Sequence, residues 1–328
     1  MIRSISAMLA VLLGIGAAFA SAQAAEKDYV PARIELHAFQ SVWITDQQFL
    51  TGDDKGKAVT LAGALRIPPV AGKLPVVVLM HGSGGISSNV PMWEQDLGAL
   101  GIATFTIDSM SGRGLQGVGT NQILLGRANM ILDIYRALEV LAKNGRVDPE
   151  RVAIMGFSRG GQATLYSSLT RFQKMWNKSG ITPAAYIPFY PDCSTTYKED
   201  AEITDRPVRI FHGAPDSYNP IATCKAYRDR LKAAGRDVDI TEFPNAPHGY
   251  DSPLGAVPAV VAKDNQSVRN CKLREGDGGV LINAGTEQPF AYSDACVALD
   301  PVVGGDAEAR EASRKAVAAF LKGVFKLN

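Results

Sequence analysis

The chain has 328 residues, 46% of them hydrophobic, and its 34 basic residues nearly balance 33 acidic ones for a formal net charge of +1. Beyond an N-terminal leader, the length suits one large α/β domain or two small ones. The balanced charge argues against nucleic acid as the main partner and against a substrate gathered by long-range electrostatics.

The first 24 residues have the features of a secretory signal peptide. Arg3 is followed by an apolar run from Ala7 to Ala20 and then by small residues that offer A-x-A cleavage sites. The run is short for a membrane span, and no basic stop-transfer cluster follows it. We therefore expect cleavage near Ala24, export to the periplasm or the medium, and no membrane span in the remaining chain.

All the cysteines, Cys193, Cys224, Cys271 and Cys296, lie in the second half of the chain. In an oxidising compartment such thiols pair, so we expect two disulfides. Three sets of pairings are possible, and we favour Cys193 with Cys224 and Cys271 with Cys296 because each pair closes a local loop. A metal site is the alternative, but the sequence lacks the C-x-x-C pair or the nearby histidines that it needs.

The first half of the chain alternates patterns typical of strands and of helices. Two stretches with alternating apolar residues predict antiparallel edge strands at Arg33–Phe39 and Ala58–Ile67. Continuous apolar runs predict strands buried on both faces at Pro75–Met80 and Ile102–Ile107. Helices are expected at Pro91–Leu100 and along a stripe formed by Leu124, Ala128, Ile131, Tyr135, Leu138 and Ala142.

The same alternation continues in the second half. Strands are predicted at Arg151–Gly156, Ala185–Tyr190, Val208–His212 and Val238–Phe243, and helices at Gly160–Trp176 and Ile221–Ala234. A final helix, Ala307–Phe325, is expected to bury a face made of Ala309, Ala312, Ala316, Phe320 and Val324. Strands joined by helices indicate one α/β domain over residues 25–328, with a mostly parallel sheet and helices on both faces.

Two connections bear on access to a site in this domain. About seventeen residues separate Tyr190 from Val208, which leaves no room for a large lid domain. By contrast, residues 250–305 form a long insert that contains Cys271 and Cys296. Connections of that length are often functional, so the insert is either a disulfide-stapled flap or a surface excursion that covers the sheet edge.

The strongest chemical signal is GFSRGG at residues 156–161, which fits G-x-S-x-G and lies between a predicted strand and a predicted helix. A sharp strand-to-helix turn needs small residues beside the serine, and it lifts the hydroxyl of Ser158 clear of the sheet. The start of the helix also directs free N–H groups towards the site. The pattern predicts Ser158 as a nucleophile, and a glycine-rich turn that only packs helix on strand is the alternative.

A serine nucleophile needs a base, and the chain has four histidines. In the α/β-hydrolase fold, where such turns occur, the order along the chain is serine, acid, histidine. His37 and His81 precede Ser158, and His212 ends a strand too early to follow an acid in the next loop. His248 follows the next strand and is the predicted general base, with an exposed loop histidine as the alternative.

The acid that orients this histidine is expected after the preceding strand. Asp216, in HGAPD, occupies that position and would accept the imidazole N–H of His248. A turn-forming aspartate is the alternative, since Pro-Asp sequences favour turns. Asp251 is a weaker candidate because it lies too close in sequence to His248 to orient it.

Acyl transfer also needs N–H donors for the developing oxyanion, each worth about 3–4 kcal/mol in the transition state. One donor in this fold follows the nucleophile, which makes it the backbone N–H of Arg159. The second would come from HGSGG at residues 81–85, where glycines let the backbone approach a substrate, and we favour the N–H of Ser83. His81 is expected to be a structural partner in that loop.

Two further side chains fall on the expected active-site side of the sheet and are candidate substrate contacts. Arg113 would hold a substrate carboxylate bidentately, with an ion pair to Asp108 as an equal alternative. Trp93 would form a wall of the substrate pocket, although such a residue more often packs within its helix.

Taken together, HGSGG, DSMSGRG, GFSRGG, GAPD and PHGYD resemble the dienelactone hydrolase family from Val59 to Tyr250. The resemblance implies an α/β-hydrolase fold with no large lid domain, acting on esters or lactones, with Ser158, Asp216 and His248 at the family's triad positions. Members that cleave dienelactones carry cysteine where this chain has Ser158, so a general carboxylesterase is expected instead. The cysteine-bearing insert lies outside the core family pattern.

The expected mechanism has two steps and needs no metal or organic cofactor. His248 deprotonates Ser158, which attacks the carbonyl carbon, and water activated by the same histidine hydrolyses the acyl-enzyme. A peptidase or thioesterase would use the same residues, and a non-catalytic binding protein on this scaffold is the alternative from another class. The expected partner is a small-molecule ester or lactone, and the sequence does not specify the oligomeric state.

Overall fold

The computed structural model describes residues 30–327, so the predicted signal peptide at residues 1–24 lies outside the described residues. Strands (β), α-helices (α) and short 3₁₀ helices (η) follow one another along this part of the chain. Their order is β1 (Arg33–Trp43), α1 (Asp46–Thr51), β2 (Lys57–Ile67), β3 (Leu74–Met80), α2 (Asn89–Ala99), β4 (Ala103–Asp108), η1 (Ser111–Arg113), η2 (Gln122–Leu124), α3 (Asn129–Ala142), β5 (Val147–Phe157), α4 (Arg159–Tyr166), α5 (Thr170–Trp176), β6 (Ala185–Phe189), β7 (Thr195–Thr196), β8 (Val208–Gly213), α6 (Ile221–Ala233), β9 (Val238–Phe243), β10 (Val260–Val261), β11 (Leu273–Glu275), η3 (Asp277–Gly279), β12 (Leu281–Asn283), β13 (Gln288–Pro289), β14 (Val302–Val303) and α7 (Ala307–Phe325).

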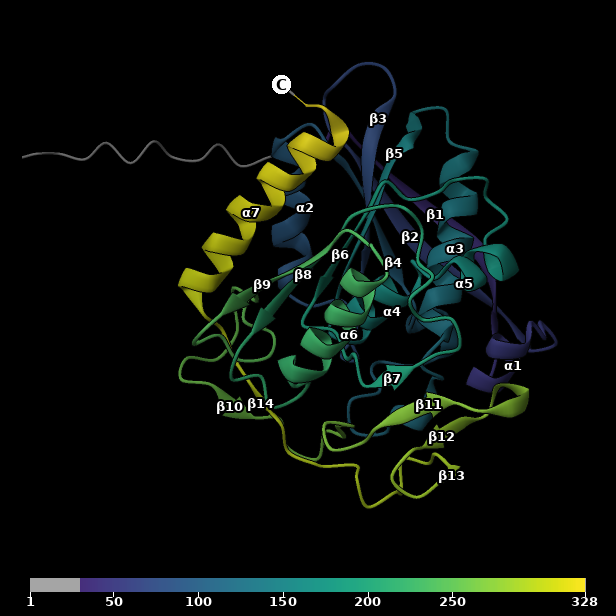
Figure 1. Ribbon diagram of the computed structural model, residues 1–328. Helices are drawn as coiled ribbons and strands as arrows, with labels where there is room; N and C mark the ends of the chain where they lie inside the picture. The colour runs from purple at the N-terminus through teal and green to yellow at the C-terminus, as the bar shows by residue number, and fades with distance from the viewer. Residues whose placement is uncertain (1–29, 328) are drawn as a thin grey trace, which may run out of the picture.

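The central sheet has the strand order β1-β2-β4-β3-β5-β6-β8-β9 (Figure 1). β1 pairs antiparallel with β2 and β2 antiparallel with β4, whereas every further neighbouring pair is parallel. All residues of β3 are buried, as its continuous apolar run predicted. The predicted mostly parallel sheet is therefore confirmed, and the carboxyl ends of its parallel strands meet at one edge.

Helices cover both faces of this sheet (Figure 1). α2 and α7 pack on one face, and α1 and α3 to α6 pack on the other. Each face has its own cluster of buried apolar side chains. Val77 and Leu79 of β3 belong to the cluster under α2 and α7, and Val76 and Val78 belong to the cluster on the opposite face, because successive side chains of a strand point to opposite faces. Each such side chain contributes about 1.5–3 kcal/mol through burial, so the two clusters hold the sheet and its strand ends in place.

The C-terminal helix α7 has the predicted bounds but buries a different face. The buried residues of the helix are Ala309, Ser313, Val317, Leu321 and Phe325. The prediction was correct for Ala309, and each of the other four predicted residues lies one position before the residue that is buried. The cause is a polar contact that hydropathy does not reveal: the Ser313 hydroxyl lies 2.9 Å from the Tyr250 hydroxyl, inside the core. This hydrogen bond and the larger Leu321 and Phe325 side chains set the rotation of the helix.

The single helix predicted at Gly160–Trp176 is in fact two helices, α4 and α5. The hydroxyls of Ser167 and Ser168 donate to the carbonyls of Thr164 and Leu165, at 2.8 and 2.6 Å. Such bonds compete with helix propagation, and the next residue, Leu169, has an extended backbone. The hydrophobic pattern alone did not reveal this break.

The predicted start of the helix along the stripe from Leu124 to Ala142 was also wrong. Leu124 belongs to η2 and is 42% exposed, and α3 begins only at Asn129. The Asn129 side chain accepts from the backbone N–H of Ile44 at 3.1 Å and donates to its carbonyl at 2.7 Å. This pair of bonds ties the start of α3 to the end of β1.

The insert, residues 250–305, runs along the edge where the parallel strands end (Figure 1). Within it β10 pairs with β14, and β13, β12 and β11 form a small sheet with β7. Because β7 belongs to the short connection between β6 and β8, the insert packs on that connection. No helix in the described part of the chain is long and apolar enough to cross a membrane.

Both disulfides join the cysteines that the local-loop argument favoured. Cys193 is bonded to Cys224 and Cys271 to Cys296. The second bridge closes a small apolar cluster inside the insert, in which Val268 and Leu273 are buried. The first bridge joins the end of the β6 region to the start of α6.

Candidate active site

Ser158 lies on a sharp turn between β5 and α4. Its backbone has φ 55° and ψ −115°, a conformation that non-glycine residues rarely adopt. The flanking glycines are required by space, because a Cβ on Gly156 would lie 2.2 Å from the Gly160 carbonyl oxygen and one on Gly160 would lie 2.2 Å from that of Met80. The predicted G-x-S-x-G turn is thus built as the motif requires.

The structure brings Ser158, His248 and Asp216 together. The His248 Nε2 atom lies 2.9 Å from Ser158 Oγ, and its Nδ1 atom lies 2.8 Å from Asp216 Oδ2. The three residues follow β5, β9 and β8, whose carboxyl ends are held side by side by the sheet. Each distance is within hydrogen-bond reach, which is the geometric condition for a nucleophile, a base and an orienting acid.

The carboxylate of Asp216 is buried and fully engaged. Its Oδ1 atom accepts from the backbone N–H groups of Tyr218 and Asn219 at 2.8 and 2.9 Å, while Oδ2 faces His248. Burial by itself raises the pKa of Asp216, but the nearby His248 and these hydrogen bonds outweigh burial and lower the pKa below its ordinary value. The acid is therefore ionised at neutral pH and accepts the imidazole N–H.

Two tyrosine rings pack against the imidazole of His248. The Tyr190 ring is edge-on at a centroid distance of 4.7 Å, and the Tyr218 ring is tilted at 4.6 Å. Neither tyrosine was among the predicted site residues. Tyr190 lies in FYPD and Tyr218 in PDSYNP, each just after a strand of the sheet. Their place at strand ends, with Tyr218 two residues after Asp216, was the signal in the sequence that they could border the site.

Asp251 and Trp93 form a buried network behind this ring. Asp251, the weaker candidate for the orienting acid, does not face His248, as expected, whereas the prediction that Trp93 forms a wall of the substrate pocket was wrong. The Asp251 carboxylate accepts from Trp93 Nε1 at 2.8 Å, from Asn89 Nδ2 at 3.2 Å and from the Tyr190 hydroxyl at 2.6 Å. Burial raises the pKa of Asp251 in spite of these donors. Trp93 is 1% exposed, so it packs in the core instead of lining the substrate pocket.

Arg113 does not reach the site either. Its guanidinium is buried and makes a bidentate ion pair with Asp133, at 2.7 and 2.9 Å, and also donates to the Ser109 carbonyl at 2.8 Å. Asp108, the expected alternative partner, instead accepts from the backbone N–H groups of Met110 and Ser111. Both sequence hypotheses for Arg113 were wrong, because its partner lies on α3, distant along the chain.

The remaining buried histidines are structural. His81 Nε2 accepts from the Ser109 backbone N–H at 3.1 Å, so its Nδ1 carries the proton and donates to the Gly82 carbonyl at 2.8 Å. His212 Nδ1 contacts the Gly213 carbonyl at 3.0 Å and stays 4.0 Å from Asp216. Burial lowers the pKa of both histidines and keeps them neutral.

The loop after β3 faces Ser158, as predicted. Gly82 closes a turn with Gly85, and a Cβ on Gly82 would lie 3.3 Å from the Cβ of Ser158. In the described part of the chain, neither the N–H of Ser83 nor that of Arg159 donates to a backbone carbonyl. Both residues line a small cavity together with Ser158, so their backbone N–H groups remain the candidate oxyanion donors.

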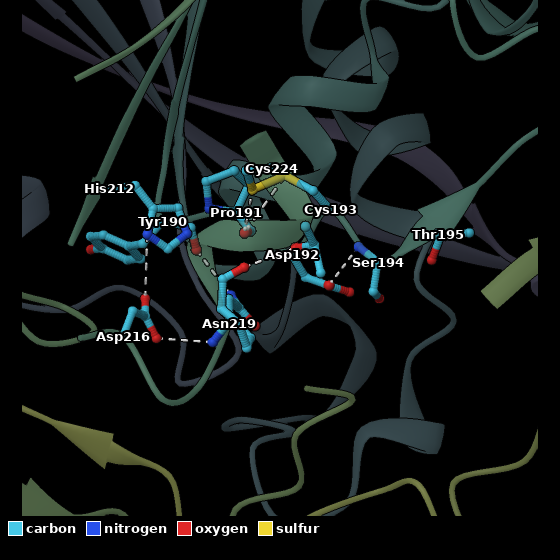
Figure 2. Close-up of a disulfide and its surroundings, with 12 residues drawn as sticks. Tyr190, Pro191, Asp192, Cys193, Ser194, Thr195, His212, Asp216, Asn219 and Cys224 are labelled. Atoms are coloured by element: carbon cyan, nitrogen blue, oxygen red, sulfur yellow. Dashed lines mark hydrogen bonds and ion pairs between the residues drawn. A yellow bond between two sulfur atoms is a disulfide. The ribbon is translucent and has the colours of Figure 1, made fainter. Parts of the chain in front are cut away.

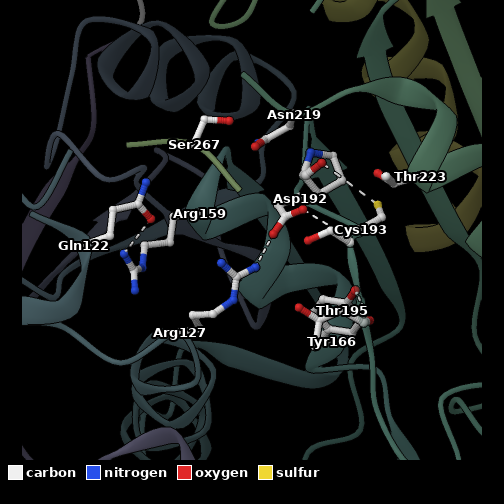
Figure 3. A network of polar contacts seen from close by, with 12 residues as sticks. Gln122, Arg127, Arg159, Tyr166, Asp192, Cys193, Thr195, Asn219, Thr223 and Ser267 are labelled. Atoms are coloured by element: carbon white, nitrogen blue, oxygen red, sulfur yellow. Dashed lines mark hydrogen bonds and ion pairs between the residues drawn. The ribbon is translucent and has the colours of Figure 1, made fainter. Parts of the chain in front are cut away.

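Behind Ser158 the structure has a buried polar chamber of about 20 Å³. Figure 3 shows the two arginines that border it. Arg127 makes an ion pair with Asp192, and Arg159 donates to Gln122 Oε1 at 3.2 Å and to the Leu125 carbonyl. The chamber is large enough for about one water molecule.

The Cys193–Cys224 bridge supports the loop that carries the acid. Figure 2 shows Asn219 between this bridge and Asp216, to which its backbone N–H donates. The Asn219 side chain donates to the Tyr190 carbonyl at 2.9 Å. The disulfide and this hydrogen bond together fix the acid loop against the end of β6.

Ser158 and His248 open into a cleft of about 600 Å³. The glycine-rich loop after β3 forms one side, and Ala262, Asn265 and Val303 of the insert form the other. The insert is therefore part of the site, which sequence alone left undecided. Across the described residues, no group of three His, Cys, Asp or Glu side chains is arranged to hold a metal ion.

The strand order, the strained serine turn and the three-residue contact define an α/β-hydrolase fold. Residues 61–272 match the model of the dienelactone hydrolase family, and the chain belongs to this family. Acyl-protein thioesterase 1 from Gibberella zeae is 31% identical over 104 residues, which are 30% of this chain and 42% of that protein. A putative carboxymethylenebutenolidase from Methylorubrum extorquens is 24% identical over 197 residues, 56% of this chain and 66% of the relative.

The fold is also similar to that of a solved structure. A dienelactone hydrolase-like promiscuous phosphotriesterase from metagenomic libraries superposes with a TM-score of 0.54 at 18% identity, over 89% of this chain and 98% of that chain. Identity at this level shows the fold alone. The chain spans less than two thirds of the length of the two curated relatives, so their named activities do not transfer directly.

Proposed function

We propose that this protein is a serine hydrolase that cleaves carboxylic esters or lactones through an acyl-enzyme. The observation that carries the proposal is the contact of His248 with both Ser158 Oγ and Asp216 Oδ2, at 2.9 and 2.8 Å. Membership of the dienelactone hydrolase family supports it, as does similarity to relatives named as a thioesterase and a carboxymethylenebutenolidase.

In the proposed reaction His248 removes the hydroxyl proton of Ser158 as Oγ attacks the carbonyl carbon. The N–H groups of Ser83 and Arg159 receive the oxyanion, and the protonated His248 gives its proton to the leaving alkoxide. Water then gives a proton to the same histidine and attacks the acyl carbon. As the bond from this carbon to Ser158 Oγ breaks, His248 returns the proton to Oγ, and the carboxylic acid leaves. Asp216 holds the imidazole in the required tautomer throughout.

We also propose that residues 25–328 form one exported domain in which residues 250–305 are an insert that walls the cleft. Two disulfides support an oxidising compartment, because cysteines in reducing compartments seldom pair. The pattern of residues 1–24 supports a periplasmic or secreted location. N-terminal sequencing of the secreted protein tests this point, and a mature chain that retains Arg3 would contradict it.

The decisive experiment replaces Ser158 by Ala and measures turnover of p-nitrophenyl acetate. We expect kcat to fall by roughly a factor of 10⁴ or more, with an unchanged thermal unfolding profile. Ser293→Ala, an exposed serine of the insert, is the matched control and should behave as wild type. A fluorophosphonate probe should label the wild type and not Ser158→Ala. Full activity in Ser158→Ala would show that another group attacks the ester.

A further inference from the structure

The cleft in front of Ser158 carries no side chain that would pair with a charged substrate. Among the described residues that line it there is no Asp, Glu, Lys or Arg. An ionised group that leaves water for this cleft would lose hydration without gaining an opposite charge, which is strongly unfavourable. The lining therefore selects against anionic and cationic substrates.

The two buried arginines do not change this conclusion. Arg127 is paired with Asp192, and Arg159 is bonded to Gln122 and Leu125. The chamber that they border has a volume of about 20 Å³, which holds a water molecule but not a carboxylate-bearing group. Arg113, the other arginine considered for this role, is paired with Asp133 away from the cleft.

The cleft does offer uncharged groups that both donate and accept hydrogen bonds. Gln116, Thr120 and Asn265 line it, and the side chains of these three residues make no hydrogen bond to any other described residue. An amide presents a carbonyl and an NH₂ side by side, which complements a hydroxyl that also does both. Beside them Phe157, Tyr190 and Tyr218, which are 2%, 3% and 8% exposed, add a small apolar area to the lining.

The space for the acyl group is small. The chamber behind Ser158 is closed to anything larger than water. A second cavity of about 550 Å³, with Trp43, Leu281 and Phe290 in its lining, shares no lining residue with the cleft. A long acyl chain attached to Ser158 thus has no apolar tunnel to enter.

From this geometry we infer the substrate class: a short-chain acyl ester, such as an acetate, of an uncharged polyhydroxylated alcohol of the sugar type. Hydroxyls of the alcohol bind the uncharged side chains of Gln116, Thr120 and Asn265 in the cleft. The inference rests on the proposed function and adds the identity of both halves of the ester.

The test compares four esters with the purified mature chain: p-nitrophenyl acetate, mono-p-nitrophenyl succinate, p-nitrophenyl octanoate and a monoacetylated methyl glucoside. We expect kcat/KM for p-nitrophenyl acetate to exceed that for the succinate and octanoate esters by at least roughly tenfold. The glucoside should be deacetylated with saturation kinetics. A preference for the succinate or the octanoate ester, or no release of acetate from the glucoside, overturns the inference.

Two variants of cleft residues test whether these side chains bind the alcohol part of the ester. Gln116→Ala and Asn265→Ala should each lower kcat/KM for the glucoside, relative to p-nitrophenyl acetate, by roughly 2–10-fold, the effect of one lost hydrogen bond. Asn270→Ala, an exposed asparagine of the same insert outside the cleft, should leave this ratio at the wild-type value. An unchanged ratio in both cleft variants contradicts the inference. If the wild type hydrolyses none of the esters, the proposed function itself fails, whereas hydrolysis of p-nitrophenyl acetate without the glucoside overturns only the substrate class.

Discussion

Gly304 donates its backbone N–H to the carbonyl oxygen of His248 over 3.0 Å. This bond joins the end of the insert to the loop that carries the candidate base. Next to it the backbone N–H of Val302 donates to the Ser217 hydroxyl at 2.9 Å, which joins the insert to the acid loop. The insert therefore braces the loops that carry His248 and Asp216 as well as lining the cleft.

The first prediction concerns this brace. A Cβ on Gly304 would lie 2.7 Å from the Ala259 Cβ and 2.8 Å from the Ala256 carbonyl oxygen, so Gly304→Ala must displace the segment. We expect kcat for p-nitrophenyl acetate to fall by roughly tenfold or more, because small displacements of catalytic groups are costly.

Gly323→Ala is the matched control, since a Cβ there meets no atom within 4 Å. It lies in α7, where alanine favours the helix, so stability should rise by up to about 1 kcal/mol with unchanged activity. Wild-type activity in Gly304→Ala would show that the brace does not position His248.

The second prediction concerns the acid. Asp216→Asn should lower kcat by about 10⁴-fold, because an amide NH₂ facing His248 Nδ1 favours the wrong imidazole tautomer. The fold should persist, since the remaining oxygen still accepts from Tyr218 and Asn219. Steady-state kinetics and circular dichroism check both statements. Asp54→Asn, at an exposed site far from the cleft, serves as control, and a kcat for Asp216→Asn close to that control would remove Asp216 from the mechanism.

The third prediction separates the two disulfides. Each should contribute about 3–4 kcal/mol to the free energy of unfolding in the chain-entropy model, since they close loops with separations of 31 and 25 residues. Replacing Cys271 and Cys296 by Ala should loosen the cleft wall and mainly raise KM. Replacing Cys193 and Cys224 should loosen the acid loop and mainly lower kcat. Denaturant unfolding and kinetics of both double variants test this division, and the reverse pattern would refute it.

The fourth prediction is a loss of stability in mild acid. Burial lowers the pKa of His81 and His212 below the ordinary value of 6.5, so the folded protein binds fewer protons than the unfolded chain below that pH. The free energy of unfolding should therefore fall as the pH drops below about 6.5, by up to about 1.4 kcal/mol per pH unit for each histidine. Asp216 adds a further loss only at lower pH, because its lowered pKa lies on the acid side of 3.8.

Urea unfolding at about pH 7.5 and about pH 5.5 measures this effect. His212→Asn keeps a polar group near the Gly213 carbonyl and removes one titrating ring, so it should reduce the difference between the two pH values. Equal unfolding free energies of the wild type at both pH values would contradict the prediction.

The sequence by itself determined the parts of this protein that depend on local pattern and chain order. Buried strands could be predicted from continuous apolar runs, because a strand covered on both faces must be apolar throughout. Ser158 could be predicted as a nucleophile because a strand-to-helix turn leaves room only for glycine two residues before and two residues after the serine. His248 and Asp216 followed from their order after successive strands.

Tertiary structure decided the partners of residues that are distant along the chain. Arg113 makes an ion pair with Asp133, and hydrogen bonds join Trp93 to Asp251 and Ser313 to Tyr250. Each of these contacts corrected a hypothesis that was based on local sequence. The same holds for the insert, whose contact with His248 and whose place in the cleft depend on how strand ends meet at one edge of the sheet. A polar group buried in the core takes whichever partner packing brings within about 3 Å, and no periodicity in the sequence encodes that choice.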